Sequence, residues 1–112
     1  MVIVYDTTEK KSFKDVEVWL NNLRRLIQKD VEVFLVGSKI DLKKERVIAK
    51  RLGMQFANKN LIHFQEVSAT DIVSTDSLLN KITSYALKEN TSMMDYKDVS
   101  EKEHGCVRCL IL

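Results

Sequence analysis

Polar side chains that could read a nucleotide base follow two apolar runs of this 112-residue sequence. Residues 38–41 are Ser-Lys-Ile-Asp, and residues 68–70 are Ser-Ala-Thr. An ionised Asp41 offers two acceptor oxygens, which suit the paired N1–H and amine donors of guanine and not the corresponding edge of adenine. Backbone N–H groups around Ala69 could donate to guanine O6. The structural alternative is that Asp41 caps the following helix and that Ser68 only ends a strand.

The last four residues carry a signal for lipid modification. Cys109 is followed by two aliphatic residues and a final Leu112, which fits the C-a-a-X prenylation pattern and favours a geranylgeranyl group. One lipid chain binds a membrane reversibly and the tail is not polybasic, so we expect a second anchor on Cys106, by palmitoylation or a second prenyl group. Two alternatives stay open: an unmodified Cys106 thiol, and a hydrophobic C-terminus that docks on the body of the protein.

The remaining candidate ligands do not suggest a metal or redox site. Cys106 and Cys109 form a C-x-x-C pair, but a zinc site needs a fourth ligand and a redox pair needs a strand-to-helix setting. His63 lies in an apolar run, where we expect a core or surface residue rather than a ligand. We therefore predict no metal site.

The composition is typical of one soluble globular domain. Apolar residues make up 45% and charged residues 30% of the chain, and the net charge of +2 is too balanced to suggest a nucleic-acid polymer as partner. No apolar run approaches the about 18–20 residues of a membrane-spanning helix, and the start lacks the features of a secretory signal. Three glycines and no proline favour long helices and strands over a turn-rich all-β fold.

The hydrophobic pattern alternates between strands and helices. Short apolar runs at 2–5, 31–36 and 62–67 predict buried strands, the second of them ended by Gly37. Helical spacing predicts helices that begin at about residue 12, at about residue 45 and at Ser74 or Thr75, with Trp19 in the core stripe of the first. Residues 12–15 have the form of a capping box.

This order predicts an α/β fold of three layers, in which three parallel strands alternate with three helices. The body is expected to span residues 1–90. From residue 91 the pattern stops, so residues 91–112 are expected to form a disordered, flexible, hypervariable tail that carries the lipid signal.

Residues 2–88 resemble the C-terminal half of a small GTPase of the Ras superfamily. A strand with GSKIDL, a helix, and a strand with EVSAT resemble its two guanine-specificity motifs, Asn-Lys-x-Asp and Ser-Ala-Lys. The start, VIVYDTTEKKSF followed by a helix with Trp19, resembles the Rab branch. The resemblance implies a partial P-loop-NTPase-like (Rossmann-like) fold.

The resemblance also assigns roles to single residues. Asp41 matches the carboxylate that reads guanine, and Lys39 matches the lysine over the ribose and base. Ser68 and Ala69 match the pair that orients this carboxylate and presents a backbone N–H to O6. Ser38 stands where Asn is usual and Thr70 where Lys is usual, and we expect these two departures to weaken affinity more than base choice.

The implied function is that of a GTP/GDP-binding switch in vesicle trafficking. Such a protein is held by a geranylgeranyl tail on the cytosolic face of endomembranes, keeps a cytoplasmic pool, and works with Rab-type regulators and effectors. The phosphate loop G-x-x-x-x-G-K-[ST] needs two glycines five apart, and the glycines here are Gly37, Gly53 and Gly105.

We therefore expect Mg²⁺ only in a full-length form, and enzymatic activity of this chain stays open. The alternative is a non-enzymatic, membrane-tethered half-domain (a pseudo-GTPase fragment) that acts only through protein partners.

Overall fold

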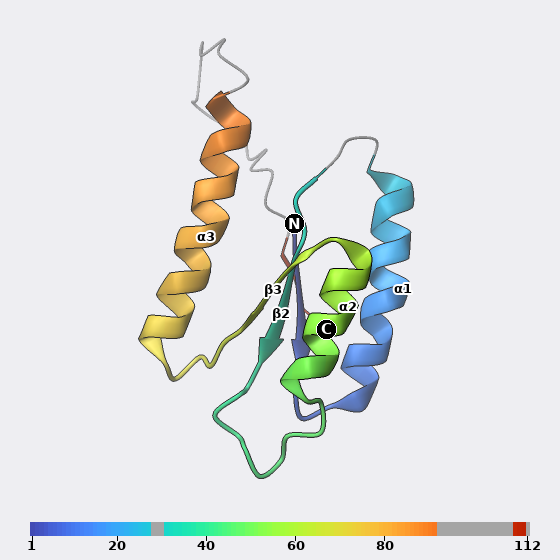
Figure 1. The fold of residues 1–112 in the computed structure, drawn as a ribbon, viewed down its shortest axis with the longest axis vertical. Coiled ribbons are helices and arrows are strands. Elements are labelled where there is room, and N and C mark those ends of the chain that lie inside the picture. Colours follow the sequence, from blue (N-terminus) through green and yellow to red (C-terminus); the bar gives the residue numbers. More distant parts are fainter. Residues whose placement is uncertain (28–30, 92–108, 112) are drawn as a thin grey trace.

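The computed structural model describes residues 1–27, 31–91 and 109–111. Strands and helices alternate along the chain, as the hydrophobic pattern predicts (Figure 1). In order, the elements are β1 (Val2–Asp6), α1 (Lys10–Leu26), β2 (Phe34–Ser38), α2 (Lys50–Asn60), β3 (His63–Glu66), α3 (Ile72–Thr91) and β4 (Cys109–Ile111). In the described part of the chain, no helix is both long and apolar enough to span a bilayer.

The strands form one parallel sheet in the order β3-β2-β1-β4. Val2 lies opposite Phe34 of β2, and Phe34 lies opposite His63 of β3. The three predicted parallel strands are therefore confirmed. The fourth strand is an addition, because Cys109–Ile111 belong to the segment predicted to be flexible, yet they pair with the outer edge of β1. The predicted flexibility of residues 92–108 and 112 lies outside the described residues.

Helices cover both faces of the sheet, which gives the predicted three layers. On one face, α1 and α2 bury a core that includes Ile3, Tyr5, Leu20 and Leu35. On the other face, α3 packs Leu78 and the partly buried Ile82 and Tyr85 against a smaller cluster of Val2, Phe34 and Val36. Figure 1 shows this separation, with α3 on one side of the strands and α1 and α2 on the other. Near-continuous apolar strands are expected where both faces are covered.

The first helix differs from the sequence prediction at its start. It begins at Lys10 with Glu9 as the cap residue, so the predicted capping box at residues 12–15 is wrong. Ser12 lies inside the first turn, where its buried hydroxyl donates to the Glu9 carbonyl oxygen (2.8 Å) and accepts from the Asp6 N–H (3.0 Å). Trp19, predicted to lie in the core, is 39% exposed, while its neighbour Leu20 is buried.

The observed ends of the other helices and strands also differ from the predicted ends by a few residues. Strand β2 runs through Gly37 instead of ending there, and α2 begins at Lys50, about five residues later than predicted. Helix α3 begins at Ile72, and a carboxylate oxygen of Asp71 accepts the Val73 N–H (3.1 Å). Asp71 therefore caps this helix in place of the predicted Ser74 or Thr75.

The glycine of α2 has a packing reason. A Cβ atom on Gly53 would lie 2.5 Å from an aromatic carbon of Phe64 and 2.6 Å from the Tyr5 hydroxyl oxygen. Only a residue without a side chain lets the helix backbone pass this close to the two rings. The helix therefore sits directly on β1 and β3.

Candidate nucleotide-base site

Three loops meet at the carboxyl ends of β1, β2 and β3, where open α/β sheets bind their ligands. They contain the residues after Asp6, the long connection between β2 and α2, and residues 67–71. Every base-reading residue predicted from the sequence lies in the second or third of these loops or at its start. The parallel order of the strands places the loops side by side.

Asp41 and Ser68 are joined directly across two loops. The Ser68 hydroxyl, buried at 3% exposure, donates to Asp41 Oδ1 over 2.7 Å. Since that hydroxyl has one proton, the Thr70 hydroxyl at 2.7 Å must donate to Ser68 Oγ, and the Thr70 N–H donates to the same oxygen (3.2 Å). Thr70, Ser68 and Asp41 thus form a chain of hydrogen bonds that ends on one carboxylate oxygen.

The groups that would face a base remain open in this arrangement. Within the described part of the chain, Asp41 Oδ2 forms no hydrogen bond, and neither does the Ala69 N–H. Asp41 is exposed, and it does not cap α2, whose cap residue is Ala49. The structural alternative for Asp41 is therefore wrong, whereas Ser68 both follows the end of β3 and orients the carboxylate.

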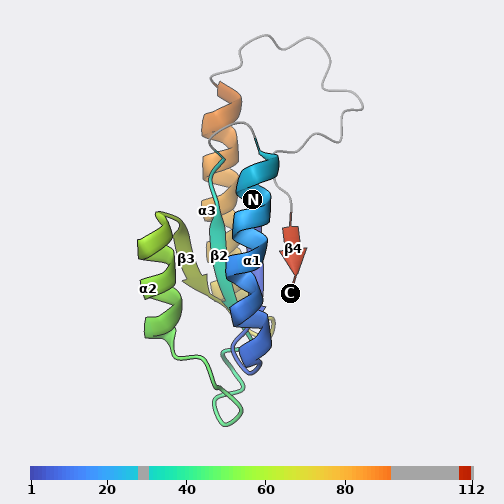
Figure 2. The same ribbon diagram turned by 90° about the vertical axis from the view of Figure 1, so that its right-hand side faces the viewer.

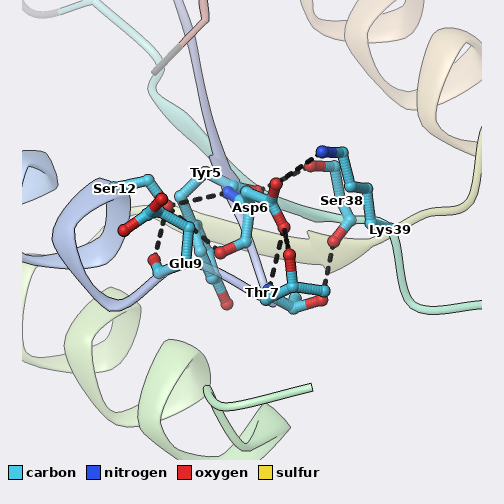
Figure 3. Close-up of polar contacts among 8 residues, drawn as sticks. Tyr5, Asp6, Thr7, Glu9, Ser12, Ser38 and Lys39 are labelled. Carbon is cyan, nitrogen blue, oxygen red and sulfur yellow. Dashed lines mark hydrogen bonds and ion pairs between the residues drawn. The ribbon is translucent and has the colours of Figure 1, made fainter. Parts of the chain in front are cut away.

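The Lys39 side chain reaches toward Asp6 at the end of β1 (Figure 3). Its ammonium group is 2.6 Å from Asp6 Oδ2, and Asp6 Oδ1 accepts the Thr8 N–H (2.8 Å) and hydroxyl (2.6 Å). Burial works to raise the pKa of Asp6, but the hydrogen bonds from Lys39 and Thr8 outweigh it and hold the pKa below its usual value. The hydrogen bond to Asp6 raises the pKa of Lys39. Both groups are ionised at neutral pH.

The backbone at Lys39 turns out of the sheet. Its φ of 62° lies in the left-handed region, which is uncommon for a residue with a side chain. Two flanking contacts hold this turn: the Leu42 N–H donates to the Lys39 carbonyl oxygen (3.1 Å), and the Ser38 hydroxyl donates to the Tyr5 carbonyl oxygen (2.8 Å). Ser38 is thus engaged with the β1 backbone, so its hydroxyl serves the loop.

Thr7 fixes both ends of the loop that carries Lys39 and Asp41, a role that the sequence did not reveal. Its hydroxyl donates to the Ser38 carbonyl oxygen (2.8 Å), as does its N–H (3.2 Å; Figure 3). Its own carbonyl oxygen accepts the N–H groups of Val47 (2.9 Å) and Ile48 (3.0 Å). The residue is fully buried. The only signal in the sequence was a polar residue after an apolar run.

Arg46 ties the far end of the same loop to β3. Its Nε donates to the Ile48 carbonyl oxygen (2.8 Å), its Nη1 donates to Glu66 Oε2 (3.2 Å), and its Nη2 pairs with Glu66 Oε1. The Glu66 side chain is only 8% exposed. A helix that began at about residue 45, as predicted, would include Arg46, but α2 begins at Lys50 and leaves Arg46 in the loop above β3.

The remaining predicted residues do not join this site. Cys109 lies opposite Val2, at the end of β1 that is farther from the three loops. Cys106 is outside the described residues. His63 Nε2 is 2.7 Å from Glu32 Oε2, and its ring stacks on Phe34 at a centroid distance of 4.6 Å. In the described ranges, no three His, Cys, Asp or Glu side chains are placed to hold a metal ion.

The sequence matches the Ras family over residues 1–88. It is 32% identical over 103 residues to GTP-binding protein YPT1 of Saccharomyces cerevisiae, a match that covers 92% of this chain and 50% of that protein. It is 37% identical over 81 residues to Ras-related protein Rab-11C of Dictyostelium discoideum, covering 72% of this chain and 36% of that protein. With Ras-related protein Rab-10 of Diplobatis ommata it shares 41% identity over 69 residues, which are 62% of this chain and 34% of that protein. The chain thus spans half or less of the length of these relatives.

Proposed function

The chain belongs to the Ras family, and from this premise we propose that it carries the guanine-reading half of a Rab-type GTPase of vesicle trafficking. The proposal rests on one observation above all: the Ser68 hydroxyl orients Asp41 by donating to its Oδ1, and Oδ2 of this exposed carboxylate forms no hydrogen bond within the described residues. An open carboxylate oxygen can accept from the N1–H and amine groups of guanine, and the open Ala69 N–H can donate to its O6. Adenine presents the opposite pattern at the corresponding positions.

The same contacts support selectivity for guanine, but they do not support tight binding of the nucleotide. A site built to bond a polar edge can reject an analogue that lacks it by up to about 10⁴–10⁵. Base contacts alone supply only a few hydrogen bonds, worth about 1–3 kcal/mol each when charged, against the entropic cost of association. We therefore expect this chain to bind GTP and GDP weakly, in the millimolar range or above.

Phosphate binding and hydrolysis belong to segments outside these residues. The 112-residue sequence contains no G-x-x-x-x-G-K-[ST] pattern. Phosphoryl transfer depends on a held phosphate chain, Mg²⁺ and an attacking water. We expect no hydrolysis of GTP above background by this chain, and no gain in affinity on adding Mg²⁺.

A second candidate function is a non-enzymatic half-domain that acts only through protein partners, such as Rab-type regulators and effectors. One observation favours it: two of the predicted base-site residues are already engaged inside the protein. Lys39 is paired with Asp6, and the Ser38 hydroxyl donates to the Tyr5 carbonyl oxygen. A nucleotide would have to draw Lys39 out of its ion pair to gain a contact over the ribose.

A titration followed by amide NMR separates the two candidates. We expect GMP, and not AMP, to shift the amide signals of Asp41 and Ala69, because only guanine matches the open carboxylate oxygen. Asp41→Asn should abolish this preference, since an amide offers one acceptor where two are needed. Glu45→Gln removes the same charge from an exposed site in the same loop, so this control should keep the preference. Equal shifts with both nucleotides, or none with either, would favour the protein-binding half-domain.

We further propose that Cys109 carries a geranylgeranyl group, with loss of residues 110–112, and that Cys106 supplies a second anchor. The protein would then lie on the cytosolic face of endomembranes, with a cytoplasmic pool. Cys109→Ser should release the protein to the soluble fraction, and Cys106→Ser should release only part of it. Membrane fractionation, combined with the intact mass of the C-terminal peptide, tests both changes. An unmodified Cys109 in a membrane-bound wild type would refute the anchor.

A further inference from the structure

The loop of residues 67–71 is fastened to the first turn of α3. Ser68 is buried in this loop, and the residues that follow it lead directly into the helix at Ile72. Figure 2 shows α3 lying along the sheet, with its first turn at the same end as the long loop after β2, and Figure 1 shows the same arrangement. The start of this helix therefore lies at the end of the sheet that carries the candidate base site.

Two hydroxyl groups of this first turn contact the main chain of Ser68. The Thr75 hydroxyl donates to the Ser68 carbonyl oxygen (3.2 Å), and the Ser74 hydroxyl oxygen accepts the Ser68 N–H (3.3 Å). Each of the two hydroxyls also donates to the Asp71 carbonyl oxygen, over 3.0 Å in both cases. Ser74 and Thr75 thus bridge the two ends of the turn that carries Ala69.

The bonds to Ser68 are not the ordinary bonds of a helical hydroxyl. A serine or threonine in a helix often donates to the carbonyl oxygen three or four residues earlier, and the bonds to Asp71 are of this kind. Among the residues that the structure describes, the Thr83 hydroxyl bonds only in this way, to the Leu79 carbonyl oxygen (2.8 Å). The bonds to Ser68 span six and seven residues, so they form only where the loop folds back over the start of α3.

These contacts bear on Asp41 because they hold the residue that orients it. The main chain of Ser68 is bonded to α3 and to the Asp71 N–H, which donates to the Ser68 carbonyl oxygen (3.1 Å). The Ser68 hydroxyl donates to Asp41 Oδ1 (2.7 Å). Since a side chain takes one of a few staggered rotamers relative to its own backbone, the place of the Ser68 main chain decides where its hydroxyl points. A shift of this main chain would therefore weaken the bond to Asp41.

We propose that Thr75, together with Ser74, is a positioning residue of the base site, which acts through Ser68 on the direction of the Asp41 carboxylate. The effect on selectivity rests on the proposed function, the reading of guanine by Asp41. The link from α3 to Asp41 stands on the hydrogen bonds alone. A change that draws the first turn of α3 away from the loop would then lower the selectivity for guanine without altering any group that contacts the nucleotide.

The NMR signal of the Asp41 carboxyl carbon tests the link in protein without nucleotide. Ser68→Ala removes the bond to Asp41 and so gives the signal position of the carboxylate without it. Thr75→Val keeps the shape of the side chain and removes the hydroxyl, and it should move the signal toward that position. Thr75→Ser keeps the hydroxyl and should leave the signal in place. Thr83→Val is the matched control, because it removes a hydroxyl of the same helix that bonds only within the helix.

Titrations with GMP and AMP test the effect on base reading. Thr75→Val should lower the preference for GMP over AMP by about fivefold, which corresponds to about one hydrogen bond between neutral groups. Thr75→Ser and Thr83→Val should keep the preference within about twofold of the wild type. A merely structural role of Thr75 would lower stability and weaken both nucleotides alike, and it would leave the ratio of the two dissociation constants unchanged.

Two results would overturn the proposal. One is an Asp41 signal that Thr75→Val leaves in place, and the other is an unchanged preference for GMP in a Thr75→Val variant whose Asp41 signal has moved. If Thr75→Val does not fold, Ser74→Ala makes the same comparison through the other bond to Ser68. If the wild type itself shows no preference for GMP, the proposed base reading fails, and the Asp41 signals of the variants still decide whether α3 is linked to this carboxylate.

Discussion

Replacing Gly53 by Ala should destabilise the protein, although Ala is the better helix former. In an exposed helix interior this change would gain about 1 kcal/mol. Here the new Cβ would lie within 2.6 Å of Phe64 ring carbons and of the Tyr5 hydroxyl oxygen, distances that real Cβ atoms essentially never show. Tyr5 is fully buried, so its ring cannot swing into solvent, and the Phe64 ring or the backbone of α2 must shift to admit the methyl group.

Overpacking of this kind costs about 1–3 kcal/mol, and the three short contacts on two rings place Gly53→Ala at the upper end of that range. With the helix gain subtracted, we expect a net loss of about 2 kcal/mol in the free energy of unfolding. Urea denaturation followed by circular dichroism measures it. Gln55→Ala, on the exposed side of the same helix, should change stability by no more than about 0.5 kcal/mol. A Gly53→Ala variant as stable as the wild type would refute the reasoning.

Three further predictions concern stability. Burial raises the pKa of Tyr5 to about 12; the nearby Glu66 adds to this effect and Arg46 opposes it. As the pH rises, the unfolded chain therefore loses the Tyr5 proton before the folded chain does. The free energy of unfolding should fall by roughly 1.4 kcal/mol per pH unit between about pH 10 and 12. Tyr5→Phe should remove that part of the pH profile and cost little at pH 7, because the buried hydroxyl has no hydrogen-bond partner among the described residues. Arg46→Ala should cost about 2 kcal/mol by leaving the buried Glu66 carboxylate unpaired, and Glu66→Ala in addition should recover part of it in a double-mutant cycle. The isolated chain should unfold with less than about 5 kcal/mol, since β3 leaves an open edge; one cooperative urea transition above that value would contradict us.

The elements and their order could be predicted from the sequence because they depend on apolar periodicity. Residues such as Ile3, Leu20 and Leu35 are buried where the pattern places them. The residues at which the helices begin were harder to predict. Ser12 can either cap a helix or lie in its first turn, and only the position of the end of β1 decides between these two roles. Trp19 lies at a core spacing, yet a ring of that size stays partly in solvent at the margin of the core.

The candidate site, too, could be predicted from the sequence only in part. Asp41 and Ser68 could be singled out from their types and their place after apolar runs, and they prove to be bonded to each other. The contacts of Thr7 and Arg46 could not be foreseen, since each depends on which loop backbone comes near after folding. For β4, the sequence predicts only the general alternative of a C-terminus that docks on the body, and not its pairing with β1. Its partner strand depends on the sheet order, which local sequence does not specify.

The closure of the base-reading loop at Thr7 has a consequence for how this surface can evolve. The bonds from Val47 and Ile48 end on a carbonyl oxygen, and one of the two bonds to Ser38 starts from an N–H. Such main-chain bonds survive almost any substitution at the positions that make them, proline as a donor excepted. Side chains of the loop that make no such contact, unlike those of Ser38 and Arg46, can therefore change while the path of the loop is kept. The exposed residues 42–45 can thus change without refolding the loop that presents Asp41.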